Sequence, residues 1–478
     1  MKLFRFIARN ELQILLRNRF QLLVLSLFVL IGVYSIYYGH TEITRQSERI
    51  SQVEDSILNL QKAYRNFIQA DTATASGKKE YEQAAYPYVV RFQYNFVAAN
   101  KPAPVAALAL GQRDLYPYYF VLNAQNLYTQ TLKGEIYNPF KLSAGNFDLS
   151  FVMIYLMPLL IIGLCFDLVS FEKDTGTFTM LRISNFSFRS TMMSRLLFRY
   201  LLVSIITLVL SVTGFVVAGV SFSRSGLVMF NWLAVLLIYD ALWFAILLFI
   251  NSFNKSTSFN ASAAISAWIL LLIVIPSVLN LAGQRNERTS AIPFATLMRS
   301  RSMPGTDAAM NSALRAFYDY YPALKPQDTS VKSLFFKYQG YSAFLAVDQM
   351  TSAAQVDKFY REVERSAARQ ERMNLINPAV NTQEMLNSLA ATDLKTEFDF
   401  KAAVKQFHGD IFWFSNTALF ANRAMSAEDY AHSPVFHFTP QTFQQRRLAG
   451  GILQLLLLAL LLSAGGYRNL GDKKIVNR

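Results

Sequence analysis

Residues 228–250 read VMFNWLAVLLIYDALWFAILLFI, a run in which Asp240 is the single charged residue. The hydrocarbon core of a bilayer takes about 20 apolar residues in helical form, so this run is long enough to cross a membrane once. Similar runs occur at five other places in the chain: Phe20–Tyr38, Leu149–Phe171, Leu196–Val220, Phe259–Leu281 and Leu448–Tyr467. The sequence therefore predicts an all-α polytopic membrane protein with six transmembrane helices.

Two long polar insertions, Gly39–Asp148 and Ala282–Arg447, interrupt the series of spans. Long helical runs are expected in the second insertion, at Gln349–Leu375 and Thr382–His408. Hydrophobic residues make up 53% of the chain and charged residues only 16%, against roughly 25% charge in soluble domains. We therefore expect a large, mainly helical domain that is built from both insertions and has a core of its own.

Helices are also expected on both sides of the first span. Lys2–Arg17 has a basic side and an apolar side, which favours a helix in the lipid headgroup plane over a plain basic flank, although Glu11 falls on the apolar side. After the span, apolar residues recur in heptad steps, which predicts a stalk helix continuous with the span from Thr41 to Gln69. The seam can pack against the other insertion or another chain: Ile43, Ile50, Val53, Ile57, Leu60, Tyr64 and Phe67.

The net charge of +14 decides the orientation. The basic residues lie beside the apolar runs rather than on one soluble face, which argues against nucleic acid as a partner. They gather on the side of the two termini, whereas the short loop Ser221–Leu227 on the other side has only Arg224. The positive-inside rule then places both termini in the cytoplasm and both insertions outside. The first span reads as an uncleaved anchor, and the single cysteine, Cys165, allows no intrachain disulfide, which together suit a bacterial inner membrane.

These expectations divide the chain as follows: 1–19, cytoplasmic interfacial helix; 20–38, first span; 39–148, periplasmic insertion with the stalk; 149–281, second to fifth spans with a cytoplasmic connector at 172–195; 282–447, second periplasmic insertion; 448–467, sixth span; and 468–478, cytoplasmic tail.

Signatures of catalysis are missing from the sequence. It has no phosphate-binding Gly-x-x-x-x-Gly-Lys-Ser/Thr loop, no Gly-x-Ser-x-Gly elbow and no metal-binding His or Cys motif. We therefore expect neither an enzyme nor a cofactor or metal site. Inside the spans, Asp167 and Asp240 are costly in lipid, and Arg199 could pair with either. A structural ion pair is favoured over a proton site coupled to transport.

The most distinctive segment is the connector between the second and third spans, which reads FEKDTGTFTMLRISNFSFRSTMMSRLLFR from Phe171 to Arg199. Short, basic and amphipathic, it resembles the membrane subunit, or permease, of the second type of ABC exporters. In that family a glutamate ends the second span, a Gly-Thr pair follows, and a Leu-rich turn precedes a Ser/Arg-containing start of the third span. The matching positions are Glu172, Gly176, Thr177, Leu181, Ser187, Arg189, Ser190 and Arg195.

The resemblance implies that the connector acts as a coupling helix, which docks into a separate ABC ATPase subunit that binds ATP and magnesium. The residues expected to take part are Glu172, Gly176, Thr177, Leu181, Arg182 and Arg189. It also implies a second permease, either another copy or a homologue. Other expected partners are membrane lipid and periplasmic proteins.

A subgroup of that family with enlarged outer regions has a stretch resembling Ser-Pro, then Leu-Ala-Gly-Thr-Asp, then Phe. The corresponding residues are Asn377-Pro378, Leu389-Ala390-Ala391-Thr392-Asp393, Phe398 and Phe400. Asn377 stands in place of serine and Ala391 in place of glycine, so the match to the subgroup is partial.

Three functions therefore remain open at the level of sequence. The chain could be an ATP-driven exporter subunit, or a subunit that uses ATP hydrolysis to move its periplasmic domain as a lever. The third alternative is a membrane-anchored periplasmic scaffold or sensor without transport. A sensor normally has a cytoplasmic output domain, and the cytoplasmic segments expected here are short.

Overall fold

The computed structural model describes residues 2–131, 146–170, 172, 176, 187–284, 307–326, 335–440 and 445–470. Its described part is mainly helical, with one two-stranded sheet. Within the described ranges, five helices are long and apolar enough to cross a membrane: α2 (Arg19–Phe67), α11 (Phe188–Val217), α12 (Phe222–Asn251), the continuous stretch Thr257–Leu281, and α21 (Gln445–Asn469). The chain thus has the helices of a multi-pass membrane protein.

The predicted second span is shorter than the sequence indicated. It consists of α7 (Leu149–Phe151), the π-helix η3 (Val152–Leu156) and α8 (Met157–Cys165), and turns follow from Phe166. The expected end at Phe171 was therefore wrong. Leu168 and Val169 are 2% and 1% exposed, so the apolar run continues through a buried turn after the helix has ended.

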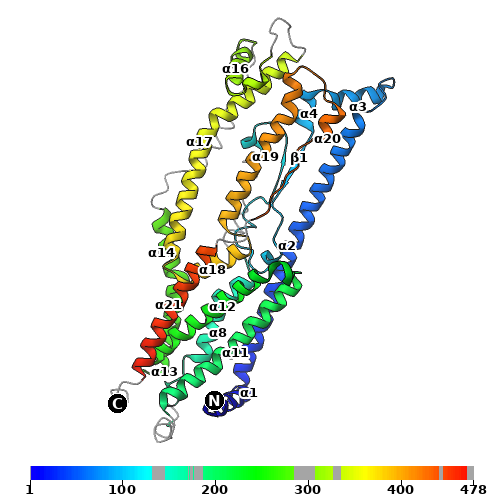
Figure 1. The fold of residues 1–478 in the computed structure, drawn as a ribbon. Helices are drawn as coiled ribbons and strands as arrows, with labels where there is room; N and C mark the ends of the chain where they lie inside the picture. The colour runs from blue at the N-terminus through cyan, green and yellow to red at the C-terminus, as the bar shows by residue number, and fades with distance from the viewer. Residues whose placement is uncertain are drawn as a thin grey trace.

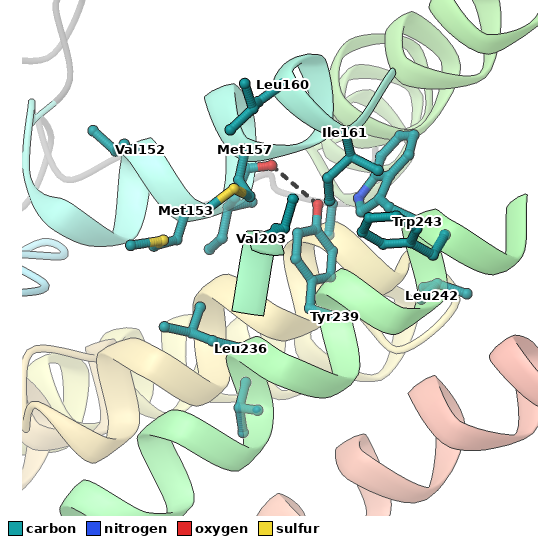
Figure 2. Close-up of a cluster of buried hydrophobic side chains, with 14 of the residues drawn as sticks. Val152, Met153, Met157, Leu160, Ile161, Val203, Leu236, Tyr239, Leu242 and Trp243 are labelled. Carbon is teal, nitrogen blue, oxygen red and sulfur yellow. Dashed lines mark hydrogen bonds between the residues drawn. The ribbon is translucent and has the colours of Figure 1, made fainter. Parts of the chain in front are cut away.

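The membrane helices pack around α12, which contacts α8, α11, α13 (Thr257–Ile269) and α21. In Figure 2, Tyr239 and Trp243 of α12 lie against Met157 and Ile161 of α8. The Tyr239 hydroxyl donates to the Ile154 carbonyl at 3.0 Å. A π-helix frees carbonyls from the helical hydrogen-bond ladder, and in an apolar interior each freed carbonyl needs another donor.

A second π-helix, η4 (Leu270–Val274), lies between α13 and α14 (Ile275–Gln284). Its Leu271 carbonyl accepts a 2.6 Å hydrogen bond from Asn377 Nδ2. Asn377 is also the N-cap of α18 (Pro378–Leu389), where its side-chain oxygen accepts from Ala379 N and Val380 N. Serine and asparagine are both good N-caps, so Asn377, which stands in place of the serine noted in the sequence comparison, still caps the start of α18.

The predicted helices around the first span are present. α1 covers Lys2–Arg17, and Asn18 caps the start of α2, its side chain accepting from Gln21 N. Helix α2 then continues unbroken through the apolar run and the stalk, a length of ~73 Å at 1.5 Å per residue. Figure 1 shows it running from α1 at one end of the molecule to α3 at the other.

The stalk seam packs within the chain. Ile50, Ile57 and Tyr64 are 2%, 9% and 0% exposed, and Leu60 and Phe67 pack against the core of the insertion domain. By insertion domain we mean the described residues between 39 and 148 and between 282 and 447. Of the alternatives for the seam, intrachain packing is confirmed.

The insertion domain combines both polar segments. The first contributes the stalk, α3 (Ala75–Ala85), α4 (Pro87–Gln93), β1 (Phe96–Ala99), the 3-10 helix η1 (Pro104–Ala107), β2 (Tyr119–Leu122) and α5 (Leu127–Thr131). The second contributes α16 (Asp307–Tyr320), the 3-10 helix η5 (Pro322–Leu324), α17 (Phe336–Asn374), α18, α19 (Leu394–Phe420) and α20 (Ala427–Ala431). Strands β1 and β2 are antiparallel, with Phe96 opposite Leu122. An aromatic core joins the two segments: the Tyr94 ring lies 5.2 Å from Tyr64 and 5.3 Å from Tyr430.

The predicted helical run Thr382–His408 is broken in two. Helix α18 ends at Leu389, and α19 begins at Leu394 with Asp393 as its N-cap. Between them, Ala391 has a φ of 54°, in the left-handed region. Its N–H donates to the Ser388 carbonyl and that of Thr392 to the Asn387 carbonyl, the hydrogen bonds of a Schellman ending. The periodicity of the sequence continues across this turn and conceals it.

His408, in α19, provides a pH-dependent prediction. The side chain is 2% exposed, and one ring nitrogen lies 2.7 Å from the Gln125 carbonyl. Burial lowers the pKa of His408 to about 4. Between this value and an unfolded pKa of ~6.5, the unfolded chain binds a proton that the folded chain does not, so stability falls as the pH drops through this window.

We expect the free energy of unfolding to be lower at pH 5 than at pH 7, with a contribution from His408 of about 2 kcal/mol. Thermal unfolding in one detergent at the two pH values measures this, with His408→Gln as the comparison. An equal pH dependence in the wild type and the variant would contradict a neutral buried histidine.

Candidate functional site

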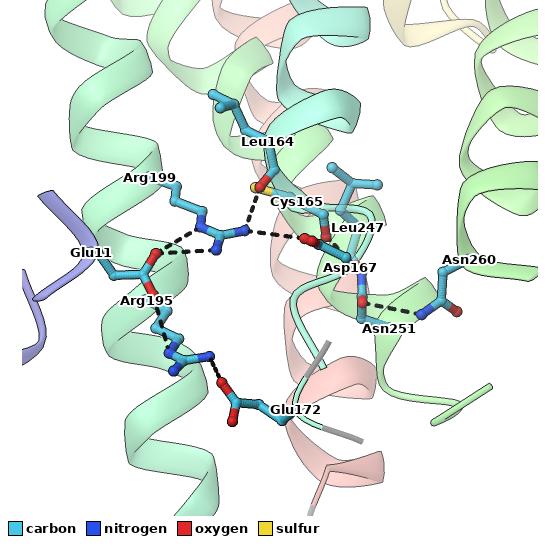
Figure 3. A network of polar contacts seen from close by, with 10 residues as sticks. All are labelled: Glu11, Leu164, Cys165, Asp167, Glu172, Arg195, Arg199, Leu247, Asn251 and Asn260. Atoms are coloured by element: carbon cyan, nitrogen blue, oxygen red, sulfur yellow. Dashed lines mark hydrogen bonds and ion pairs between the residues drawn. The ribbon is translucent and has the colours of Figure 1, made fainter. Parts of the chain in front are cut away.

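Five charged side chains form a cluster at the end of the membrane helices where α1 lies (Figure 3). They come from three separate parts of the chain: Glu11 of α1, Asp167 and Glu172 after α8, and Arg195 and Arg199 of α11. The arginines lie one helical turn apart on α11, and residues at this spacing share a face of the helix. The cluster thus brings together the N-terminal helix and the segments on both sides of the connector.

The arginines are shared among the carboxylates. Arg195 Nη1 lies 2.6 Å from Glu172 Oε1, and Arg195 Nε lies 3.2 Å from Glu11 Oε1. Arg199 Nη2 lies 3.1 Å from Glu11 Oε2, and its Nη1 is 3.7 Å from Asp167 Oδ1. The same Nη1 donates to the Leu164 carbonyl at the end of α8. Glu11 therefore bridges two arginines, and Arg195 bridges two glutamates.

These ion pairs are shielded from solvent. Glu11 and Glu172 are 7% and 5% exposed. Desolvation offsets much of the attraction in a buried pair, but removing one partner leaves a buried charge and costs several kcal/mol. The cluster therefore fixes a geometry: Glu172 at the start of the connector is tied to Arg195 at its end, and Arg195 is tied to Glu11 of α1.

Glu11 was not among the predicted site residues. The sequence does contain a signal, because a carboxylate on the apolar side of an amphipathic helix is out of pattern. In the structure that side of α1 packs against α11, where the two arginines lie. The carboxylate of Glu11 on the buried face of α1 is therefore explained by its two arginine partners on α11.

The remaining predicted connector residues do not all join this cluster. Gly176 has a φ of 73°, and a Cβ added there would meet no atom within 4 Å, so glycine serves the turn rather than a close contact. Arg189 contacts the end of α21 instead, donating to the Arg468 carbonyl at 3.3 Å, with its guanidinium 5.1 Å from the Tyr467 ring. Thr177, Leu181 and Arg182 lie outside the described residues.

Asp240 is separate from the cluster. It is 2% exposed on α12 and accepts a 2.8 Å hydrogen bond from the Thr207 hydroxyl on α11. Of the two partners considered for Arg199, the structure places Asp167 and not Asp240 beside it. Asp167 lies in the turn after α8, with its side chain 27% exposed.

A polar junction lies at the start of the helix Leu149–Cys165, at the opposite end from the charged cluster and beside the insertion domain. Asp148 caps α7: one carboxylate oxygen accepts from Phe151 N at 2.8 Å and the other from Leu110 N at 2.7 Å. The Ser150 amide donates to the Leu108 carbonyl at 2.9 Å. The start of this apolar helix is thus hydrogen-bonded to the turn after η1.

The turn between α18 and α19 is attached to the same place. The Thr392 hydroxyl donates to the Ala109 carbonyl at 2.9 Å, and the Gln112 amide donates to the Thr392 carbonyl at 3.2 Å. Gly111, with a φ of 54°, lies so close that an added Cβ would be 2.6 Å from Thr392 Oγ1. The partial match noted in the sequence at Leu389–Asp393 therefore lies where both insertions meet the membrane helices.

Ala391 provides a stability prediction at this junction. A left-handed backbone costs an alanine about 1–2 kcal/mol, and glycine avoids that cost. We expect Ala391→Gly to raise the free energy of unfolding by up to ~1 kcal/mol, after the loss of the buried methyl group is subtracted. The matched control is Ala368→Gly at an exposed position within α17, where the same change should destabilise by about 1 kcal/mol. Thermal unfolding measures both, and destabilisation by both variants would contradict the assignment.

Within the described ranges, no group of three or more His, Cys, Asp or Glu side chains is arranged to hold a metal ion. The charged cluster consists of ion pairs between two arginines and three carboxylates.

A family model described as "Domain of unknown function (DUF3526)" matches residues 294–439, less than a third of the chain and within the second insertion. Searches of the curated proteins and of the solved structures found no match.

Proposed function

We propose that the chain is the permease subunit of an ATP-binding-cassette transporter in a bacterial inner membrane. A separate ATPase subunit would bind the connector at 172–195 and drive either export or motion of the insertion domain. In this proposal both termini are cytoplasmic and the insertion domain is periplasmic. The helix Leu149–Cys165 would be the second span in chain order and would bring the number of spans to six; its length of ~26 Å is just below the ~30 Å thickness of a typical hydrocarbon core.

The observation that carries the proposal is the ion pair between Glu172 and Arg195. A partner that pushes on the connector must deliver force to helices rather than deform a loose loop. The 2.6 Å contact joins the two sides of the connector, and Glu11 extends the link to α1. At the far end of the same apolar helix, Asp148 is hydrogen-bonded to the insertion domain. A displacement at the connector would thus have a continuous packed path to that domain.

The unbroken helix α2 favours the lever form of the proposal. It extends from the α1 end of the membrane helices into the core of the insertion domain, where Tyr64 is fully buried. A rigid helix of this length transmits a tilt without a hinge. Cysteine crosslinks from Ile50 or Ile57 to the facing insertion domain would fix the stalk, and transport that survives such a crosslink would rule out the lever.

Purification from native membranes in mild detergent tests the central partner. We expect a nucleotide-binding subunit with a phosphate-binding loop to be recovered with the chain, and we expect the complex to hydrolyse ATP. Recovery of the chain alone, at full yield and correctly folded, would instead favour the membrane-anchored scaffold or sensor.

A further inference from the structure

Arg91, in helix α4 of the insertion domain, is a buried cation that is not paired with a carboxylate. The residue is 3% exposed, and its Nη1 donates to the neutral side chain of Asn416, at 3.3 Å from Oδ1. Within the described part of the chain, Arg91 forms no ion pair, and its buried Nε has no hydrogen-bond partner. A buried guanidinium without a counter-charge is strongly unfavourable, so this arrangement calls for an anion.

The charge on Arg91 persists at neutral pH. Burial lowers the pKa of Arg91 to about 10, and the nearby Tyr341 opposes that shift only in part. The charge also acts on His408 of α19, whose pKa is lowered mainly by burial and further by Arg91. His408 is therefore neutral at pH 7, and Arg91 is the cation that needs compensation.

A small recess opens beside Arg91, between α4, α17 and α19. Its volume is about 10 Å³, enough for one water-sized occupant, and it is partly open to the surface. Among the described residues that line it, none is an aspartate or a glutamate. Asp348, next to the lining residue Gln349, instead accepts a 3.0 Å hydrogen bond from Asn126 Nδ2 and is not paired with Arg91.

The lining also contains neutral hydrogen-bond donors. Gln349 Oε1 accepts from Leu127 N at 2.9 Å, which orients the amide and leaves its Nε2 as a donor. Tyr321 contributes a hydroxyl that stays protonated, because burial raises the pKa of Tyr321. Donors and one uncompensated cation, without a carboxylate, are the chemistry of an anion site.

From this combination we propose that the recess binds one small inorganic monoanion, chloride, beside the Arg91 guanidinium. A water molecule fits the same space but leaves the charge of Arg91 uncompensated, and sulfate or phosphate is too large for it. The anion joins α4 of the first insertion to α17 and α19 of the second. The site makes no use of the connector, so it stands or falls independently of an ATPase partner.

Chloride NMR of the full-length chain in detergent tests binding directly, because exchange with a protein site broadens the resonance of free chloride. In gluconate buffer of constant ionic strength, we expect the chain to give an excess chloride line width that added bromide removes by competition. Arg91→Met should abolish this excess. Arg361→Met is the matched control, because it removes an exposed cation of α17 outside the recess and should retain the excess.

Thermal unfolding provides an independent readout. A ligand present at ten times its Kd that binds only the folded chain raises the folded-to-unfolded ratio about elevenfold. Replacing gluconate with that concentration of chloride should therefore raise the Tm of the wild type and of Arg361→Met, but not that of Arg91→Met. In gluconate, Arg91→Met should unfold at or above the wild-type temperature, because the variant removes a buried charge that has no counter-ion.

A second variant keeps the cation and changes only the space. Ala346→Val, on the α17 side of the recess, narrows it and should also lose the chloride response, which covers the case that Arg91→Met does not fold. The proposal is overturned if the wild type shows no excess line width or no rise in Tm with chloride, or if either recess variant responds to chloride like the wild type. The recess would then hold water alone.

Discussion

Replacing Arg195 with glutamine is expected to lower the free energy of unfolding by about 3–5 kcal/mol, the usual cost of removing one partner from a buried ion pair. Arg195 contacts Glu172 at 2.6 Å and Glu11 at 3.2 Å, and both glutamates are nearly inaccessible to water. The cluster has three carboxylates and two arginines, so the loss of one cation leaves a single arginine against three carboxylates. Thermal unfolding of the purified chain in a single detergent measures the effect.

Arg189→Gln is the matched control, since Arg189 lies on the same helix but pairs with no carboxylate of the cluster and has an exposed hydrogen bond to the Arg468 carbonyl. It should cost less than ~1 kcal/mol. If Arg195→Gln is too unstable to purify, Arg195→Lys, which keeps the charge but loses the fork geometry, should be intermediate. Equal effects at Arg189 and Arg195 would show that the cluster does not hold α1 and α11 together.

Reversing the charge at Glu172 is expected to reduce ATP turnover by the complex at least tenfold. The proposal makes Glu172 the point where motion of the connector reaches α11, and typical coupling energies of 1–3 kcal/mol correspond to changes of about 5- to 150-fold. Glu172→Lys places a cation beside Arg195 and separates the two sides of the connector. ATP hydrolysis per mole of complex, measured in nanodiscs, is the appropriate quantity.

The control for this variant is Glu48→Lys, the same charge change at an exposed position on the stalk. It should leave turnover within about twofold of the wild type. If Glu172→Lys retains its ATPase subunit and hydrolyses ATP at the normal rate, the connector does not couple the two subunits through this ion pair.

The elements that were predictable from sequence are those in which local pattern and tertiary packing agree. Helix α2 has a continuous apolar run followed by a heptad seam, and the seam is buried as expected at Ile50 and Tyr64. The break at Ala391 was missed because alanine gives no sign of a left-handed backbone. The antiparallel pair of β1 and β2 was missed because four-residue strands among prolines and aromatics give little periodicity.

The site was predictable only in part, for a related reason. Glu172 and Arg199 stood out as charges at the ends of apolar runs, whereas the role of Glu11 depends on α1 folding back against α11, a contact that joins residues far apart in the chain. The hydrogen bonds from Asp148 and Thr392 likewise join distant turns. Sequence periodicity describes single helices, and these contacts arise only between them.

Accessibility labelling tests the central claim most directly, because the connector can receive force from an ATPase only if it faces the cytoplasm. Ser187→Cys lies at the exposed start of α11, and Val435→Cys lies in the insertion domain at a position that is 68% exposed. The native Cys165 is buried and leaves a low background. A membrane-impermeant maleimide should label Val435→Cys in intact spheroplasts, and Ser187→Cys only in inside-out vesicles. Labelling of Ser187→Cys in intact spheroplasts would contradict the proposed coupling.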